Sequence, residues 1–244
     1  MKNYISLLIF CLIPLFGISQ APKQVVDSIA IGLIDKMGQI LGGMESCTLK
    51  LSTMQDQVNE QGLYERRFNT HDVYLSGPNR FAIRSRGNSG DQGYWYDGAL
   101  LTWYSYDENN YVTIPSSSNI IATIDSVHTA FGVNFPGTDV LYPSLADDVL
   151  ENFDMVRYVG IKTLKGMECF HIIAESETHN FQLWIENSTL YLPRKYLIMK
   201  KGPTPEIFEC TYESWDSGEQ LPDALFKFTP PENARLISIM PKSL

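Results

Sequence analysis

Three segments near the end of the chain decide the fold: Phe181-Gln-Leu-Trp-Ile-Glu-Asn, Leu192-Pro-Arg-Lys-Tyr-Leu-Ile and Leu221-Pro-Asp-Ala-Leu-Phe-Lys-Phe-Thr-Pro-Pro-Glu-Asn-Ala. The first two are rich in aromatic and aliphatic residues and are joined by a short link, which predicts two antiparallel strands. The third contains three prolines and predicts a segment that closes the sheet.

Nine further stretches of the same kind make the chain rich in predicted strands. They are separated by short links that contain glycine, asparagine and aspartate, so consecutive strands are expected to pair as antiparallel neighbours. The eleven predicted strands cover residues 46–58, 62–76, 79–86, 92–97, 100–106, 111–114, 154–164, 167–175, 179–186, 193–201 and 205–215.

Helices are predicted before the first strand and in the middle of the chain, where apolar residues recur with the 3.6-residue period. The first covers residues 24–42, and Gly42-Gly43 ends it. The second begins near Asn119 or Thr123, either of which can cap it, and ends at Gly132. A short third helix covers residues 144–152. The apolar stripe of the first helix consists of Val26, Ile29, Leu33, Met37, Ile40 and Leu41.

Eleven strands are more than a flat sheet holds without curling, so we expect a mainly β (α+β) fold with an open or unclosed β-barrel. Large apolar residues occur at both odd and even positions of several strands, as in Tyr94-Trp95-Tyr96. A sheet with one solvated face would carry polar residues at every second position. Both faces are therefore expected to be covered, one by the barrel interior and one by a helix or loop.

The start of the chain predicts export. Met1-Lys2-Asn3 supplies a basic start, residues 5–16 are apolar, and Gly17-Ile-Ser-Gln offers small residues for cleavage. A membrane span needs about 20 apolar residues, and Pro14 interrupts this run. We therefore expect residues 1–20 to be a signal peptide and residues 21–244 to form one domain. That domain is expected to be periplasmic or otherwise exported, soluble after cleavage, and without stable membrane insertion.

The charge balance excludes several classes of partner. The chain carries 28 acidic and 19 basic residues, a formal charge of −9. Nucleic acid and anionic lipid surfaces attract basic proteins, so neither is an expected partner. Three cysteines, Cys47, Cys169 and Cys210, lie beyond the predicted signal peptide. Because that number is odd, at least one thiol has no partner within the chain, and the pairing of the others stays open.

Catalytic and metal-binding motifs are missing from the sequence. The histidines His71, His128, His171 and His179 lack the spacing of a zinc site, and neither a GxSxG nor an SxxK motif occurs. His71 is expected in solvent on a long hairpin, and His171 as a hydrogen-bonded strand residue. The acidic residues between Asp147 and Asp154 are expected to form an exposed face. We therefore expect a protein without enzymatic activity, metal or cofactor.

Short signatures in a fixed order carry a family resemblance. They run from the amphipathic first helix through Tyr96-Asp-Gly and Leu101-Thr-Trp-Tyr to Trp184-Ile-Glu, Leu192-Pro-Arg-Lys and Phe226-x-Phe-x-Pro-Pro. In this the chain resembles the uncharacterised predicted periplasmic proteins, a domain of unknown function, grouped with the lipoprotein-localisation factors LolA and LolB. The resemblance implies a half-open barrel with a helical lid around an apolar cavity. It also implies a carrier that shields lipoprotein acyl chains, or an envelope sensor.

Burial of an acyl chain needs only an apolar cavity, since each methylene removed from water contributes about 0.8 kcal/mol. Aromatic residues of the strands are the candidates for its lining, and the stripe of the second helix is the candidate lid. The expected lining residues are Trp95, Tyr96, Trp103, Tyr104, Phe181 and Trp184, and the expected lid residues are Ile120, Ile124, Val127 and Phe131.

Two functions remain open from the sequence. The first is an exported carrier or sensor that binds a lipid or an acylated lipoprotein under the lid. The second is a structural or interaction module of the cell envelope, with a filled barrel, no ligand and a protein partner. The volume of the barrel interior distinguishes them, because a hollow apolar interior favours the carrier.

Overall fold

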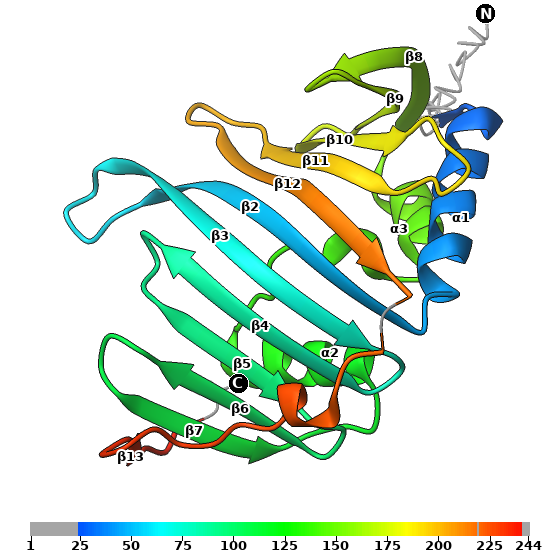
Figure 1. Cartoon of the computed structure of the whole chain (residues 1–244). Coiled ribbons are helices and arrows are strands. Elements are labelled where there is room, and N and C mark those ends of the chain that lie inside the picture. The colour runs from blue at the N-terminus through cyan, green and yellow to red at the C-terminus, as the bar shows by residue number, and fades with distance from the viewer. Residues whose placement is uncertain (1–23, 219, 241–244) are drawn as a thin grey trace, which may run out of the picture.

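A computed structural model describes residues 24–218 and 220–240, so the predicted signal peptide lies outside the described residues. One sheet of thirteen strands forms the body of the molecule (Figure 1). The eleven long strands are β2 (Ser46–Val58), β3 (Tyr64–Ser76), β4 (Arg80–Gly87), β5 (Gln92–Tyr96), β6 (Leu100–Ser105), β7 (Asn110–Pro115), β8 (Met155–Leu164), β9 (Met167–Glu175), β10 (His179–Glu186), β11 (Pro193–Lys200) and β12 (Glu206–Ser217). They confirm the eleven predicted strands, and β1 (Val25–Val26) and β13 (Arg235–Leu236) are additional.

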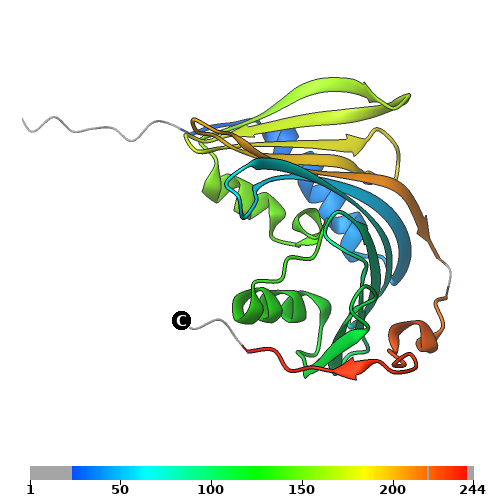
Figure 2. The same cartoon turned by 90° about the vertical axis from the view of Figure 1, so that its left-hand side faces the viewer.

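Two antiparallel meanders, β2–β7 and β8–β12, share this sheet because β12 pairs with β2. The two-residue strands form its ends, where β1 pairs with β8 and β13 pairs with β7, both in parallel. The sheet curves strongly without its end strands pairing with each other, which confirms the unclosed barrel (Figure 2).

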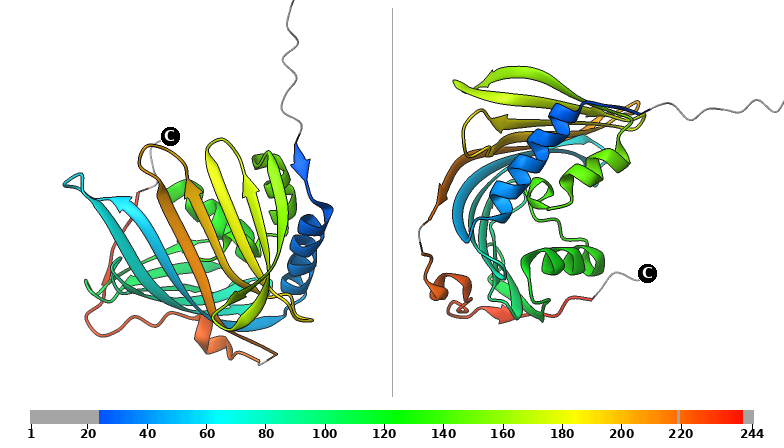
Figure 3. Two further views of the ribbon diagram at one scale, coloured as in Figure 1. Left: turned by 90° about the horizontal axis from the view of Figure 1, so that it is seen from above. Right: turned by 90° about the vertical axis from the view of Figure 1, so that its right-hand side faces the viewer.

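Three helices lie on the concave side of the sheet, here called the inner face (Figures 2 and 3). They are α1 (Ser28–Gly42), α2 (Ile120–Phe131) and α3 (Leu145–Asn152). Single 3₁₀ turns follow at η1 (Asp139–Leu141) and η2 (Asp223–Phe226). The convex side is called the outer face.

Helix α1 begins later than its sequence pattern predicts. The Asp27 carboxylate caps it by accepting a hydrogen bond from the Ile29 amide at 2.9 Å, and residues 25–26 belong to β1 instead. Val26 and Ile29 are exposed, whereas Ala30, Ile34 and Met37 are buried. The predicted stripe was therefore wrong at its start. Val26 precedes the helix, and the buried stripe runs through Ala30 and Ile34, which the apolar pattern did not select.

Helix α2 has the predicted boundaries. The Asn119 side chain accepts a hydrogen bond from the Ala122 amide at 2.9 Å, so Asn119 is the cap. Gly132 ends the helix in the left-handed region at φ 69°, where glycine carries no steric cost. Ile124 and Val127 are buried, and Ile120 and Phe131 are partly buried against the core.

The inner face is packed solid under α1 and α3. Side chains of α1 meet those of β2 and β8–β12 in one apolar cluster, which includes Met37, Leu49, Ile172, Leu183 and Tyr196. Each of these five side chains is almost completely excluded from solvent. This half of the barrel is therefore filled by the protein itself.

The closing segment covers the outer face of β4–β7. Phe226 of η2 is 1% exposed, and the Arg80 guanidinium lies 5.2 Å from its ring centroid. Further along, the Phe228 ring packs on Trp95, Tyr104 and Tyr111, with centroids 5.0 to 5.4 Å away. The segment then pairs with β7 through β13. This packing confirms that a loop covers the second face of the aromatic strands.

Candidate functional site: a cavity under helix α2

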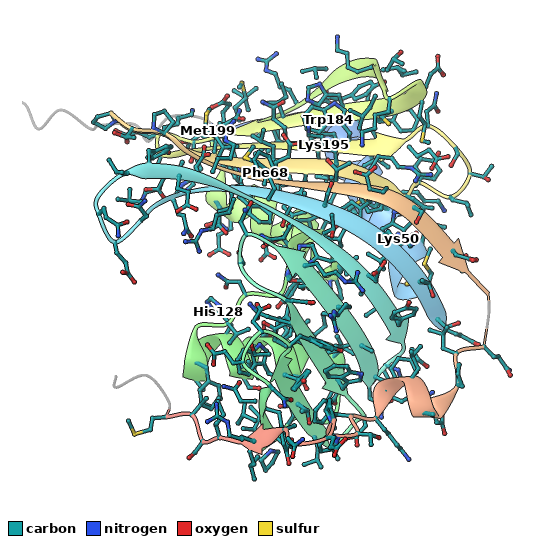
Figure 4. The ribbon with its side chains drawn as sticks, turned by 60° about the vertical axis from the view of Figure 1, so that its left-hand side comes forward. Lys50, Phe68, His128, Trp184, Lys195 and Met199 are labelled. Carbon is teal, nitrogen blue, oxygen red and sulfur yellow. The ribbon has the colours of Figure 1, made fainter. Side chains whose placement is uncertain are left out.

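The inner face is hollow where α2 crosses it. A half-open cavity of about 690 Å³ lies between the sheet and the segment that runs from α2 to α3. Thr53, His71, Ser85 and Tyr94 belong to its floor, and Ile124 of α2 to its roof. In Figure 4, His128 lies on α2 at the border of this space.

A hydrogen-bonded row of polar side chains crosses the floor on β2, β3 and β4. The Thr53 hydroxyl lies 2.9 Å from His71 Nε2, and the Ser85 hydroxyl lies 2.7 Å from His71 Nδ1. Burial lowers the pKa of His71 to about 4, although the nearby Asp72 carboxylate acts in the opposite direction. At neutral pH the imidazole is therefore uncharged, with one nitrogen that donates and one that accepts. The prediction that His71 lies in solvent was wrong.

Carboxylates stand on the exposed rim of the cavity. Asp125 Oδ1 of α2 accepts a hydrogen bond from the Tyr142 hydroxyl at 2.7 Å. The Asp139 carboxylate of η1 accepts one from the buried Tyr196 hydroxyl. Burial and the negative charge of Asp139 raise the pKa of Tyr196 well above its ordinary value. The third rim carboxylate is Asp148 of α3, which also belongs to the exposed acidic face predicted there.

A second, apolar chamber of about 390 Å³ adjoins the first between α2 and β5–β7. Gln92, Tyr94 and Val133 line both spaces and so mark their junction. The Gln92 Oε1 accepts hydrogen bonds from the Tyr94 hydroxyl and the Trp103 indole, at 3.0 and 2.9 Å. These bonds satisfy the polar atoms at the junction. The remaining lining is Leu101, Val112, Ile114, Val127, Phe131, Ile239 and Met240.

Three of the six aromatic residues expected to line a cavity belong to the inner face. Trp103 lines the apolar chamber together with the lid residues Val127 and Phe131. Tyr96 packs against Phe81 with ring centroids 5.4 Å apart. Phe181 packs in the solid half, against Phe153 and Tyr196. Of the other lid residues, Ile124 borders the larger cavity and Ile120 packs on the core.

The other three residues, Trp95, Tyr104 and Trp184, point to the outer face. Each is next in sequence to an inner-face residue, and successive side chains of a strand point to opposite faces. Phe228 covers Trp95 and Tyr104. Trp184 stacks on His171 with ring centroids 4.3 Å apart. Lys195 lies over the Trp184 indole, and Figure 4 shows the side chains of Lys195 and Trp184 beside each other.

The sequence patterns did not identify several residues as part of a cavity. These residues are His71, Ser85, Gln92, Asp125 and Asp139. Polar residues inside a strand look like solvent-facing residues in a sequence. The signal that could have identified His71 is its position on the same side of β3 as Val73, which is buried.

A family model described as "Predicted periplasmic protein (DUF2092)" matches residues 30–240. The chain belongs to this family. The match confirms the resemblance to predicted periplasmic proteins and the periplasmic location. The DUF2092 chain matches no curated protein.

Several solved structures are similar to the DUF2092 chain at low sequence identity. An uncharacterized conserved protein from Thermus thermophilus matches with a TM-score of 0.50 and 10% identity, over 86% of this chain and 99% of that one. The lipoprotein LppX from Mycobacterium tuberculosis has a TM-score of 0.49 and 11% identity, over 80% and 98%. A LolA superfamily protein from Nitrosomonas europaea has a TM-score of 0.39 and 10% identity, over 82% and 97%. At such identities the first match bears on the fold alone.

Within the described residues, the thiols of the DUF2092 chain lie in the interior. Cys47, Cys169 and Cys210 are free and buried, and burial raises the pKa of Cys47 to about 11. Over residues 24–218 and 220–240, no group of three or more His, Cys, Asp or Glu side chains could hold a metal ion. Within the same ranges, no helix is long and apolar enough to cross a membrane.

Proposed function

We propose that this protein is a periplasmic, non-enzymatic carrier or envelope sensor that binds an apolar ligand, such as a lipid or the acyl chain of a lipoprotein, under α2. The observation that carries the proposal is the apolar chamber between α2 and β5–β7. Its volume of about 390 Å³ falls within the range of about 300 to 1,000 Å³ that is typical of ligand sites.

The lining of this chamber supports binding by burial. Trp103, Val112, Ile114, Val127 and Phe131 present aromatic and aliphatic surface, and the one amide at the junction is already hydrogen-bonded. An acyl chain that enters such a chamber gains about 0.8 kcal/mol for each buried methylene without any specific polar contact. Helix α2 can act as the lid, because its apolar stripe forms one wall of the chamber. Residues 116–119 link it to β7, and residues 132–154, which include η1 and α3, lead from it to β8.

An envelope protein partner is the second candidate. The observation that favours it is the tip of the β2–β3 hairpin, where Val58, Leu63 and Tyr64 are exposed by 58, 64 and 44%. Exposed apolar residues at a loop tip are a common feature of contact sites. A carrier needs a donor or acceptor for its cargo, so this surface is compatible with the first proposal.

A fluorescent probe tests the proposal. N-phenyl-1-naphthylamine is uncharged and brightens in apolar surroundings. Val133→Trp places an indole at the junction of the two spaces and should weaken probe binding at least about tenfold. Val58→Trp makes the same exchange on the exposed hairpin and serves as the matched control.

Native mass spectrometry of the protein, purified without detergent from its own periplasm, should detect a bound lipid. Absence of both probe binding and copurified lipid would contradict the proposal. Equal probe binding by the two variants would place the binding site outside the chamber.

A further inference from the structure

The two adjoining spaces under α2 differ in chemistry, and this difference bears on the ligand. The chamber at β5–β7 is apolar, whereas the larger cavity has a floor of hydroxyl, amide and imidazole groups. Gln92, Tyr94 and Val133 line both. This inference rests on the proposed function. A ligand that spans the junction then buries its chain in the chamber and keeps a polar head group in the larger cavity.

The charged groups of the larger cavity are almost all of one sign. Its lining includes Asp125, Asp139 and Asp148, from three different elements of the roof, and contains no lysine or arginine among the described residues. Their side chains accept hydrogen bonds from the uncharged hydroxyls of Tyr142, Tyr196 and Ser144. None of the three aspartates forms an ion pair with a described lysine or arginine, so their charges are not neutralised locally.

The floor does not supply a compensating positive charge. Thr53, Gln55, Asn69 and Ser85 are neutral, and His71 is buried between two hydroxyl groups. Its lowered pKa leaves that imidazole uncharged at neutral pH. The floor can therefore donate and accept hydrogen bonds, while the field in the cavity is set by the rim carboxylates.

We infer that the ligand is a single-chain amphiphile with an ammonium head group, which lies between the rim carboxylates and the polar floor while its chain occupies the apolar chamber. An anionic head group, such as a carboxylate or phosphate, would face three negative charges without a lysine or arginine in the lining to pair with. The rim is exposed, so each carboxylate contributes only at the strength of a surface ion pair, and salt screens that contribution.

Competition among amphiphiles of equal chain length tests the inference. The competitors are dodecyltrimethylammonium, dodecyldimethylamine oxide and laurate, each used below its critical micelle concentration. Each competes with N-phenyl-1-naphthylamine at low salt and at pH 8, a pH at which ordinary histidines are neutral. We expect the ammonium compound to bind about tenfold more tightly than laurate, with the neutral amine oxide between them. High salt should reduce this preference.

Two double variants identify the source of the preference. Asp125→Asn with Asp148→Asn should bring the ammonium and laurate affinities to within about threefold of each other. Asp35→Asn with Asp216→Asn removes the same net charge from exposed positions outside the cavity lining and should retain the preference. Equal affinities in the unmodified protein, or an unchanged preference in the rim variant, would overturn the inference. Failure of the probe to bind at all would instead contradict the proposed function.

Discussion

Protonation of His71 should destabilise this protein in mild acid. The folded state holds the pKa of His71 at about 4, against about 6.5 for an unperturbed histidine. Between these two values the unfolded chain binds a proton that the folded chain does not bind. The free energy of unfolding therefore falls as the pH falls through 6.5, and the loss is nearly complete at pH 4.

The size of this effect follows from the two pKa values. One pKa unit corresponds to about 1.4 kcal/mol, so the difference amounts to about 3 kcal/mol at pH 4. The side chain needs little correction for solvent, because His71 is only 5% exposed. For a protein of ordinary stability this is a substantial fraction of the free energy of unfolding.

Urea denaturation at pH 7, 5.5 and 4 measures the effect. His71→Gln keeps a polar group without a titratable proton in this range, so its stability should fall about 3 kcal/mol less than that of the unmodified protein between pH 7 and pH 4. His128→Gln, at an exposed position on the cavity rim, should follow the unmodified protein. Parallel profiles for the His71 variant and the unmodified protein would refute the burial of a neutral imidazole between Thr53 and Ser85.

Three further predictions concern packing and reactivity. A Cβ at Gly93 would overlap the Trp95 ring, so Gly93→Ala should lower the free energy of unfolding by about 1–3 kcal/mol in urea titrations, and no loss would contradict the packing of that ring. Phe226→Ala should cost about 3–5 kcal/mol by the same measurement because the ring is fully buried, whereas a change below about 1 kcal/mol would show that the closing segment is loosely attached. Cys47 and Cys210 should react with a thiol reagent at neutral pH only after unfolding, since burial raises the pKa of both thiols; rapid reaction in native buffer would contradict their burial.

The strand order and the helix ends could be predicted because they depend on local signals. Short links between apolar runs specify an antiparallel meander, and Asn119 and Gly132 mark the ends of α2. The pairing of β12 with β2, which joins the two meanders, depends on contacts between residues far apart in the sequence. Local patterns therefore could not predict it.

The faces of the aromatic strands could not be assigned from the sequence. Alternation separates Tyr94 and Tyr96 from Trp95, but it does not say which of them points inward when odd and even positions are both aromatic. Phe228, which covers Trp95 from more than a hundred residues further along the chain, makes the outer face of β5–β7 as apolar as the inner one. The aromatic pattern was thus correctly interpreted as two covered faces and gave no rule for choosing the cavity lining.

The polar floor was hidden for a related reason. Thr53, His71 and Ser85 lie on three strands, 18 and 14 residues apart, and become neighbours only through the register of β2, β3 and β4. Each of them taken alone looks like a solvent-exposed strand residue. Their grouping therefore requires the pairing register, which a single sequence does not contain.

Crystallography with a heavy-atom ligand can locate an apolar chain bound to this protein. A crystal soaked with 12-bromododecanol, an uncharged chain with a bromine at one end, reports the position of that chain by anomalous diffraction. We expect the strongest bromine peak in the chamber between α2 and β5–β7, in contact with Trp103 and Phe131. A strongest peak on the outer face or at the β2–β3 tip, with an empty chamber, would contradict it.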